Sequence, residues 1–190
     1  MFFISIFAHT KKQYVSMRRY LVLLLLSFVF LCVSAEEHME YMGVSLGMSV
    51  DDFTAAMKEK GYVVAAENAK APKGIRLMQG DYAGGKVMLE LGYGVHTNMM
   101  TSVAVRFPQE KELSKFLTFY EAMKRVVTEQ YCTEGEVINE QGDMTTLPKY
   151  GMRMDYGTVT ISVDPDKAFT LILTYVDQYN TLEERKLRYD

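Results

Sequence analysis

Histidine and cysteine are scarce in this chain, and their scarcity excludes several kinds of chemistry. A zinc site needs several His, Cys or carboxylate ligands brought together, and here His38, His96 and Cys132 lie in unrelated segments. A Ser-His-Asp or Cys-His hydrolase needs a base beside a nucleophile, but His96 lies in a loop segment and the chain has no nucleophile elbow. Gly92-Tyr93-Gly94 begins like a dinucleotide fingerprint, yet it lacks the third glycine and leads into a strand. We therefore predict no metal, no cofactor and no catalytic residue, and we expect His96 to be solvated.

The chain also lacks a basic stripe. Residues 1–35 contain four basic residues and no acidic one, so the remainder carries 17 basic and 24 acidic side chains, a net charge of -7. An acidic surface is a poor match for nucleic acid or for anionic membranes, and we exclude a nucleic-acid partner. With 48% hydrophobic and 24% charged residues, the composition is that of a folded globular chain. Its 190 residues are enough for one ordinary domain or two small lobes.

Residues 1–35 are typical of a secretory signal peptide. Arg18-Arg19 precede an apolar run from Leu21 to Val33, and Val33-Ser34-Ala35 fits a small-x-small cleavage site. The run is 13 residues long, whereas a membrane-spanning helix needs roughly 20; an uncleaved anchor is the alternative. We expect an exported protein, periplasmic or extracellular, with no transmembrane segment in the mature chain.

The cysteines and the start of the chain refine this expectation. Met17 is a more natural start of translation than Met1. After cleavage of the signal peptide, the mature protein is expected to begin near Glu36. Lipid attachment follows a pattern with a small residue before the cysteine, but Leu31 precedes Cys32, so we do not expect a lipid anchor. After cleavage only Cys132 remains, which rules out a disulfide within the chain. We expect this thiol to be buried at the end of a helix, because free cysteine behaves as a small hydrophobe; pairing between chains is the alternative.

The stretch 47–62 predicts an amphipathic helix with both ends marked. Ser49 is a good N-cap, and Asp52, three residues on, can reach back as in a capping box. Gly61 can adopt the left-handed conformation that ends a helix. The residues expected to share one apolar face are Val50, Phe53 and Met57.

The order of a helix followed by strand-like segments then recurs. A second, longer helix is predicted from about residue 110 to 131, and alternating strands follow it. Three pairs of positions correspond between the two halves of the chain, at separations of 74, 72 and 68 residues. They are Asp81 and Asp155, Val87 and Val159, and Val103 and Leu171. We predict an α+β fold with one helix-plus-antiparallel-meander lobe at 36–108 and a second at 109–177, forming one continuous sheet. The alternative is two α+β lobes that merely look alike. Residues 178–190 form a charged tail that frays or makes a surface helix.

The helix opened by Gly47-Met48-Ser49 and closed by Lys60-Gly61-Tyr62, followed by a meander and repeated, resembles the beta-lactamase-inhibitor-protein-like architecture. The opening is similar to the helix start of small lipoproteins of the outer-membrane assembly machinery. It also resembles exported proteins of gut and oral Bacteroidetes that have no assigned activity. The resemblance covers about Met42 to Asp177 and implies a curved sheet with helices packed on one side and the opposite face free for a partner. No inhibitor contact residue can be carried over, because no motif matches one.

The open face of this sheet is the predicted binding site. Three arginines are candidate hydrogen-bonding anchors, and two methionines are candidate adaptable contacts. The predicted site residues are Arg76, Met78, Met88, Glu90, Arg106, Arg153 and Thr160. The alternative is an ordinary solvated sheet face, which antiparallel sheets commonly have.

The predicted function is that of an exported, non-catalytic binding protein that recognises another protein or a cell-envelope component; its oligomeric state is left open. The alternative is a carboxylate-based enzyme acting on glycans, which needs two opposed acids in a cleft. No such pair stands out among the acidic residues.

Overall fold

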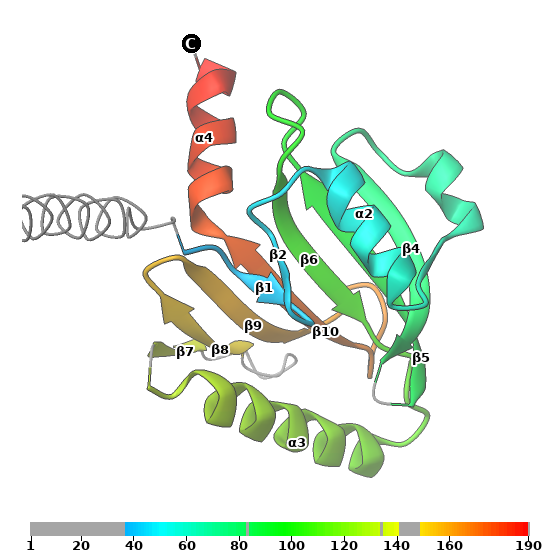
Figure 1. Ribbon diagram of the computed structural model, residues 1–190. Coiled ribbons are helices and arrows are strands. Elements are labelled where there is room, and N and C mark those ends of the chain that lie inside the picture. Colours follow the sequence, from blue (N-terminus) through cyan, green and yellow to red (C-terminus); the bar gives the residue numbers. More distant parts are fainter. Residues whose placement is uncertain (1–36, 83, 134, 141–148, 190) are drawn as a thin grey trace, which may run out of the picture. The chain divides into compact units, whose positions relative to one another are not determined.

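The computed structural model describes residues 37–82, 84–133, 135–140 and 149–189, and the fold is that of the compact unit His38–Asp190 (Figure 1). The predicted signal peptide lies outside the described residues. The helices are α2 (Val50–Glu59), the 3-10 helix η1 (Ala66–Lys70), α3 (Leu113–Tyr131) and α4 (Gln178–Tyr189). The strands are β1 (Glu40–Tyr41), β2 (Val44–Ser45), β3 (Val63–Val64), β4 (Ile75–Tyr82), β5 (Gly85–Tyr93), β6 (Met100–Arg106), β7 (Glu136–Glu140), β8 (Lys149–Met154), β9 (Gly157–Val163) and β10 (Leu171–Asp177).

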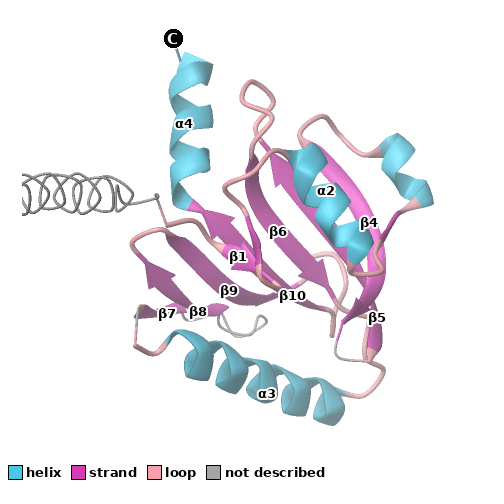
Figure 2. Ribbon diagram, in the orientation of Figure 1, coloured by secondary structure: helices cyan, strands magenta, loops and turns pink. Residues whose placement is uncertain are grey.

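Eight of these strands form one antiparallel sheet in the order β3-β4-β5-β6-β10-β9-β8-β7 (Figure 2). Each half of the sheet is a meander in chain order, and a helix, α2 or α3, precedes each half. The halves meet where the last strand of one meander, β6, pairs with the last strand of the other, β10. The predicted α+β fold with a continuous antiparallel sheet is confirmed.

The ends of α2 follow the predicted local signals. Asp52 donates its backbone N–H to the Ser49 hydroxyl oxygen at 3.2 Å, and the Ser49 hydroxyl donates to the Asp52 carboxylate at 2.7 Å. Gly61 has a φ of +88°, the left-handed conformation that a side chain would strain. The helix buries Val50, Phe53 and Met57 completely, as its amphipathic pattern predicts.

One face of the sheet is covered by α2, the β1–β2 hairpin and α3, whose buried side chains belong to a single core (Figure 1). The hairpin lies shortly before α2 in the chain. Its Tyr41 ring lies 6.3 Å from the Tyr82 ring and 5.4 Å from the Tyr175 ring. Burial raises the pKa of the Tyr41 and Tyr175 phenols well above the ordinary tyrosine value, so both remain neutral in the core.

The predicted burial of Cys132 is wrong, because this thiol is exposed. The buried stripe of α3 includes Phe116, Tyr120, Val127 and Tyr131. Cys132 directly follows Tyr131, and one residue turns an α-helix by about 100°. That rotation takes the cysteine off the buried stripe.

Candidate functional site

The outer face of the sheet, opposite the core, is the predicted site, and the strand register shows which residues share it. Across β5, β6 and β10, Met88 lies opposite Arg106, which lies opposite Ile172. The next row contains Glu90, Ala104 and Thr174. A third row contains Gly92, Ser102 and Val176.

Two of the predicted site residues, Arg76 and Met78, are not on this face. Met78 lies opposite Leu89 in the β4–β5 register, and both side chains are completely buried in the core. Arg76 points to the same side, where its guanidinium donates to the Asp51 carboxylate at 2.8 Å and to the Thr54 hydroxyl at 2.9 Å. The prediction for β4 is wrong because this strand carries apolar side chains on both of its faces. Only its register with β5 decides which of the two faces points inward.

Arg106 does lie on the outer face, but its guanidinium is occupied. It donates a hydrogen bond to the buried Asp164 carboxylate, and a second nitrogen lies 3.4 Å from the Glu90 carboxylate. Burial alone would raise the pKa of Asp164, but the hydrogen bond from the backbone N–H of Asp166 and the positive charge of Arg106 outweigh it and hold that pKa below its ordinary value. Arg106 therefore ties β6 to the end of β9 and is not a free anchor.

The remaining predicted residues differ in accessibility. Arg153 is exposed on β8 and has no ion pair within the described part of the chain. Met88 and Glu90 are half-buried on β5. Thr160 faces outward on β9 but is only 7% exposed. Its methyl group would lie 2.9 Å from a Cβ placed on Gly151, so the two residues fit closely together.

Apart from the paired Glu90 and Arg106, the half-buried outward residues of β5, β6 and β10 form a surface that we call the open patch. It consists of Met88, Ser102, Ala104, Ile172, Thr174 and Val176. Four of these six side chains are apolar. Alternation within each strand predicts that Met88, Ser102, Ala104 and Thr174 point outward, but it does not show that β10 lies beside β6 and contributes half of the patch.

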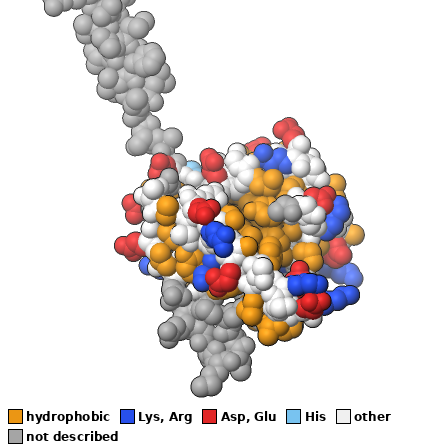
Figure 3. Space-filling model, turned by 90° about the horizontal axis from the view of Figure 1, so that it is seen from below, with side chains coloured by type: hydrophobic (Ala, Val, Ile, Leu, Met, Phe, Trp, Pro, Cys, Tyr) orange, Lys and Arg blue, Asp and Glu red, His pale blue; other side chains and the backbone are white. Residues whose placement is uncertain are grey.

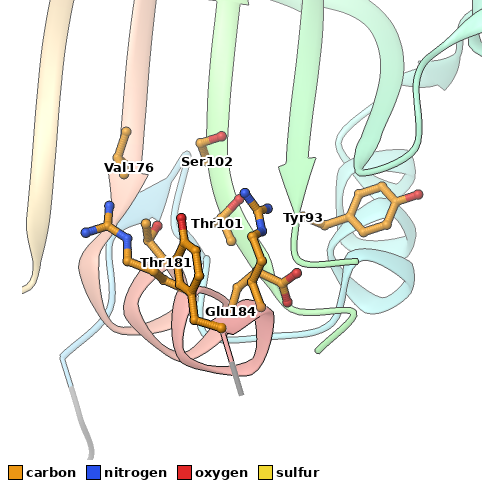
Figure 4. A pocket seen from close by; sticks show the side chains of 9 residues that line it. Tyr93, Thr101, Ser102, Val176, Thr181 and Glu184 are labelled. Carbon is orange, nitrogen blue, oxygen red and sulfur yellow. The ribbon is translucent and has the colours of Figure 1, made fainter. Parts of the chain in front are cut away.

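A cavity of about 580 Å³, which we call the α4 pocket, adjoins the open patch at the ends of β5, β6 and β10. Ser102 and Val176 line both surfaces. Figure 4 shows Thr101, Ser102 and Val176 on the strands and Thr181 and Glu184 on α4 around this space, while the Tyr93 ring points away from it. The remaining lining residues are Arg185, Arg188 and Tyr189 of α4.

A β-bulge produces the strand side of this pocket. Gly92 lies opposite Ser102, but the next residue of β5, Tyr93, lies opposite Met100, so Thr101 is the extra residue on β6. A bulge bends its strand and re-aims side chains. As a result Thr101 and Ser102, which are neighbours in sequence, both line the same cavity.

Three buried polar residues dock α4 against the sheet. The Asp177 carboxylate caps the helix by accepting the backbone N–H of Asn180 at 2.9 Å and also accepts the Met39 N–H at 3.0 Å. The Asn180 amide donates to the backbone carbonyl groups of Leu46 and Met100 at 2.8 and 2.9 Å. The third residue is Glu184. The expected surface helix of the tail is thus a docked helix.

The Glu184 carboxylate binds the β5–β6 loop. It accepts the backbone N–H groups of Val95 at 2.9 Å, His96 at 3.2 Å and Thr97 at 3.1 Å, and the Thr97 hydroxyl at 3.1 Å. Burial alone would raise the pKa of Glu184, but these hydrogen bonds outweigh it and hold the pKa below the ordinary glutamate value. The sequence holds one signal for this arrangement, because positions 177, 180 and 184 share one face of a helix.

Hydrophobic side chains also gather on the face seen in Figure 3, with charged side chains around them. The helix α3 lies on this side of the molecule (Figure 1). Its large exposed hydrophobic residues are Leu113, Leu117 and Val126. Their spacing places Leu113 and Leu117 on one margin of the buried stripe and Val126 on the other. Val126 is therefore separated from Leu113 and Leu117 by the buried stripe, and the three residues do not form one patch.

The described residues contain no group of three or more His, Cys, Asp or Glu side chains that could hold a metal ion. His96 is exposed in the β5–β6 loop, as expected. His38 lies near the start of the described chain, where its Nδ1 is 3.0 Å from the Asp177 carboxylate. No helix among the described residues has the length and apolar character needed to cross a membrane.

Comparison of the chain with protein-family models, with curated proteins and with solved structures found no match. The resemblance to the beta-lactamase-inhibitor-protein-like architecture stays a prediction. Function is therefore argued from the open patch and the α4 pocket themselves.

Proposed function

We propose that this protein is an exported, non-catalytic binding protein that recognises another protein or a component of the cell envelope through the outer face of its sheet. The observation that carries the proposal is the apolar character of the open patch. An ordinary solvated sheet face alternates buried apolar residues with outward polar ones. Here Met88, Ala104, Ile172 and Val176 point outward and are half-buried.

The composition of the patch suits recognition of a large partner. Methionine adapts its shape to different apolar surfaces, and methionine and arginine are enriched in protein interfaces. Ala104 and Thr174 form the middle of the patch, and their small side chains let another surface approach the strands closely. The paired charges lie among these residues, because Arg106 lies between Met88 and Ile172 and Glu90 lies beside Ala104.

The buried carboxylates support a non-catalytic role over the alternative of a carboxylate-based glycan enzyme. A general acid in such an enzyme needs a raised pKa. The pKa values of Asp164 and Glu184 are instead lowered, and both groups hold neighbouring segments together. The third buried carboxylate, Asp177, caps α4.

Export is part of the proposal and rests on the signal-peptide pattern of residues 1–35. Amino-terminal sequencing of the protein recovered from its own cells checks this part. A chain that begins near Glu36 and lies outside the cytoplasm is the expected result. A chain that begins at Met1 or Met17 and stays in the cytoplasm would contradict it.

The binding role is tested by capture from an envelope extract with two matched threonine variants. Thr174→Arg places a long cation in the middle of the open patch, and Thr118→Arg makes the same change at an exposed position of α3. We expect the wild type and Thr118→Arg to retain the same protein or envelope component, and Thr174→Arg to lose at least about tenfold of it, since hot spots lie near the centre of an interface. Equal retention by all three proteins, or retention by none, would contradict the proposal. Arg106 is unsuitable for this test because its loss would leave the Asp164 carboxylate buried and unpaired.

A further inference from the structure

The α4 pocket combines unpaired cations, free hydroxyl groups and an apolar wall around one open-sided cavity. From this combination we infer that the pocket binds a small organic anion, whose carboxylate or phosphate group is held by the guanidinium groups of Arg185 and Arg188. The inference is independent of the partner proposed for the open patch. It rests on the contacts that line the cavity.

The two arginines are free to bind a ligand. Neither Arg185 nor Arg188 makes an ion pair or a side-chain hydrogen bond within the described part of the chain, although the protein is acidic overall. Lys186, between them in sequence, behaves differently because its ammonium pairs with the Glu183 carboxylate. Residues three apart share one side of a helix, and both arginines are among the residues that line the cavity.

Guanidinium groups match the geometry of the proposed ligand group. Each presents a planar fork of N–H donors that can bind two oxygens of a carboxylate or a phosphate at once. On the strand side, the Thr101 and Ser102 hydroxyl groups make no hydrogen bond within the described part of the chain. They remain available as further donors.

Among the described residues, Glu184 is the one acid that lines the pocket. Its charge does not cancel the site, because its oxygens already accept three backbone N–H groups and the Thr97 hydroxyl. The lining side chains thus carry a net charge of one positive unit, from two arginines and one glutamate. A singly or doubly charged anion is the complementary ligand.

The pocket is also large enough and fixed enough for a molecule with a body beyond its charged group. Its volume of about 580 Å³ lies within the range of small-molecule sites. Val176 supplies an apolar wall. Asn180 and Glu184 hold α4 to the β2 and β5–β6 segments, so the arginines are presented by a docked helix, which lowers the entropy cost of binding.

The test titrates the purified protein with two defined probes, succinate and inorganic phosphate, at constant ionic strength, and follows the arginine Nε–H signals by nuclear magnetic resonance. We expect saturable shifts of two arginine signals with at least one probe. The probe that binds more tightly shows whether the site prefers a carboxylate or a phosphate. Absence of saturable binding of either probe would overturn the inference.

Substitutions that remove or keep the positive charge at chosen positions of α4 separate a defined site from general attraction. The double variant Arg185→Gln/Arg188→Gln is expected to weaken binding at least tenfold, because each charge-assisted hydrogen bond is worth about a factor of ten in affinity. Lys186→Gln, the control on the same helix, should bind within about twofold of the wild type, since its partner lies outside the pocket. The double variant Arg185→Lys/Arg188→Lys keeps the charge but loses the forks, so intermediate binding is expected. Full binding by the glutamine or the lysine double variant, or an equal loss in Lys186→Gln, would overturn the assignment.

Discussion

Replacing Glu184 by glutamine tests how α4 is held in place. The substitution preserves the size of the side chain but puts an NH₂ group where one carboxylate oxygen accepts N–H donors. Four donors converge on the carboxylate, from Val95, His96 and the backbone and hydroxyl of Thr97. The remaining carbonyl oxygen of glutamine can serve about half of them. A hydrogen bond to a charged group contributes about 1.5–3 kcal/mol, so we expect the free energy of unfolding to fall by about 3 kcal/mol at pH 7.

The stability difference between wild type and Glu184→Gln should also depend on pH. Because the pKa of Glu184 is lower in the folded protein, the unfolded chain takes up the proton first as the pH falls. The stabilisation is therefore complete above the ordinary glutamate pKa of 4.5 and is lost as the pH falls through the lower folded value. Glutamine does not titrate, so the difference in stability between wild type and Glu184→Gln should shrink below about pH 4.5.

Urea unfolding followed by circular dichroism, repeated from pH 7 to pH 3, measures both effects. For a unit of this size, a loss of about 3 kcal/mol lowers the melting temperature by roughly 6–12 °C. The control is Glu183→Gln, next to it in sequence, whose carboxylate is exposed and pairs only with Lys186; we expect a change below about 0.5 kcal/mol. Equal stability of Glu184→Gln and wild type at pH 7, or a difference that stays constant down to pH 3, would refute the reasoning.

Two further predictions concern other close contacts. Asp164→Asn removes the charge that pairs with Arg106, and we expect urea unfolding at pH 7 to show a loss of about 2–4 kcal/mol; a variant as stable as the wild type would contradict the proposed role of this pair. Gly80→Ala places a Cβ 2.3 Å from the Tyr62 ring, whose hydroxyl is held by the carbonyl oxygen of Asp81 at 3.0 Å. Because the ring must move, we expect an overpacking cost of about 1–3 kcal/mol, and an unchanged melting temperature would show that the core yields there without cost.

Local signals allowed part of the fold to be predicted from the sequence. The start and end of α2 depend on Ser49, Asp52 and Gly61, which lie within the helix or next to it, so their pattern is readable without knowledge of the fold. The alternation in β5 likewise predicts that Val87 and Leu89 are buried, which the structure confirms. In β4 the same method placed Arg76 and Met78 on the wrong face, because that strand alternates without a clear apolar side.

The candidate sites were less predictable, because their residues are distant in the chain. The α4 pocket joins Thr101 and Ser102 to Arg185 and Arg188, and no spacing in the sequence relates these two pairs. The open patch depends on the pairing of β6 with β10, which brings Ala104 opposite Thr174. Arg106 was correctly predicted to lie on the outer face, yet its pairing with Asp164 could not be foreseen.

The sequence by itself determined the kinds of element, their order and the composition of an acidic α+β chain, since helix caps, hydrophobic periodicity and charge depend on near neighbours and on totals. The tertiary structure alone decided the strand register, the facing of β4, the burial of Glu184 and the meeting of α4 with the β5–β6 bulge. These features depend on packing and hydrogen bonding between segments tens of residues apart. Such contacts form only when the whole sheet is assembled, and the surfaces proposed for binding consist of them.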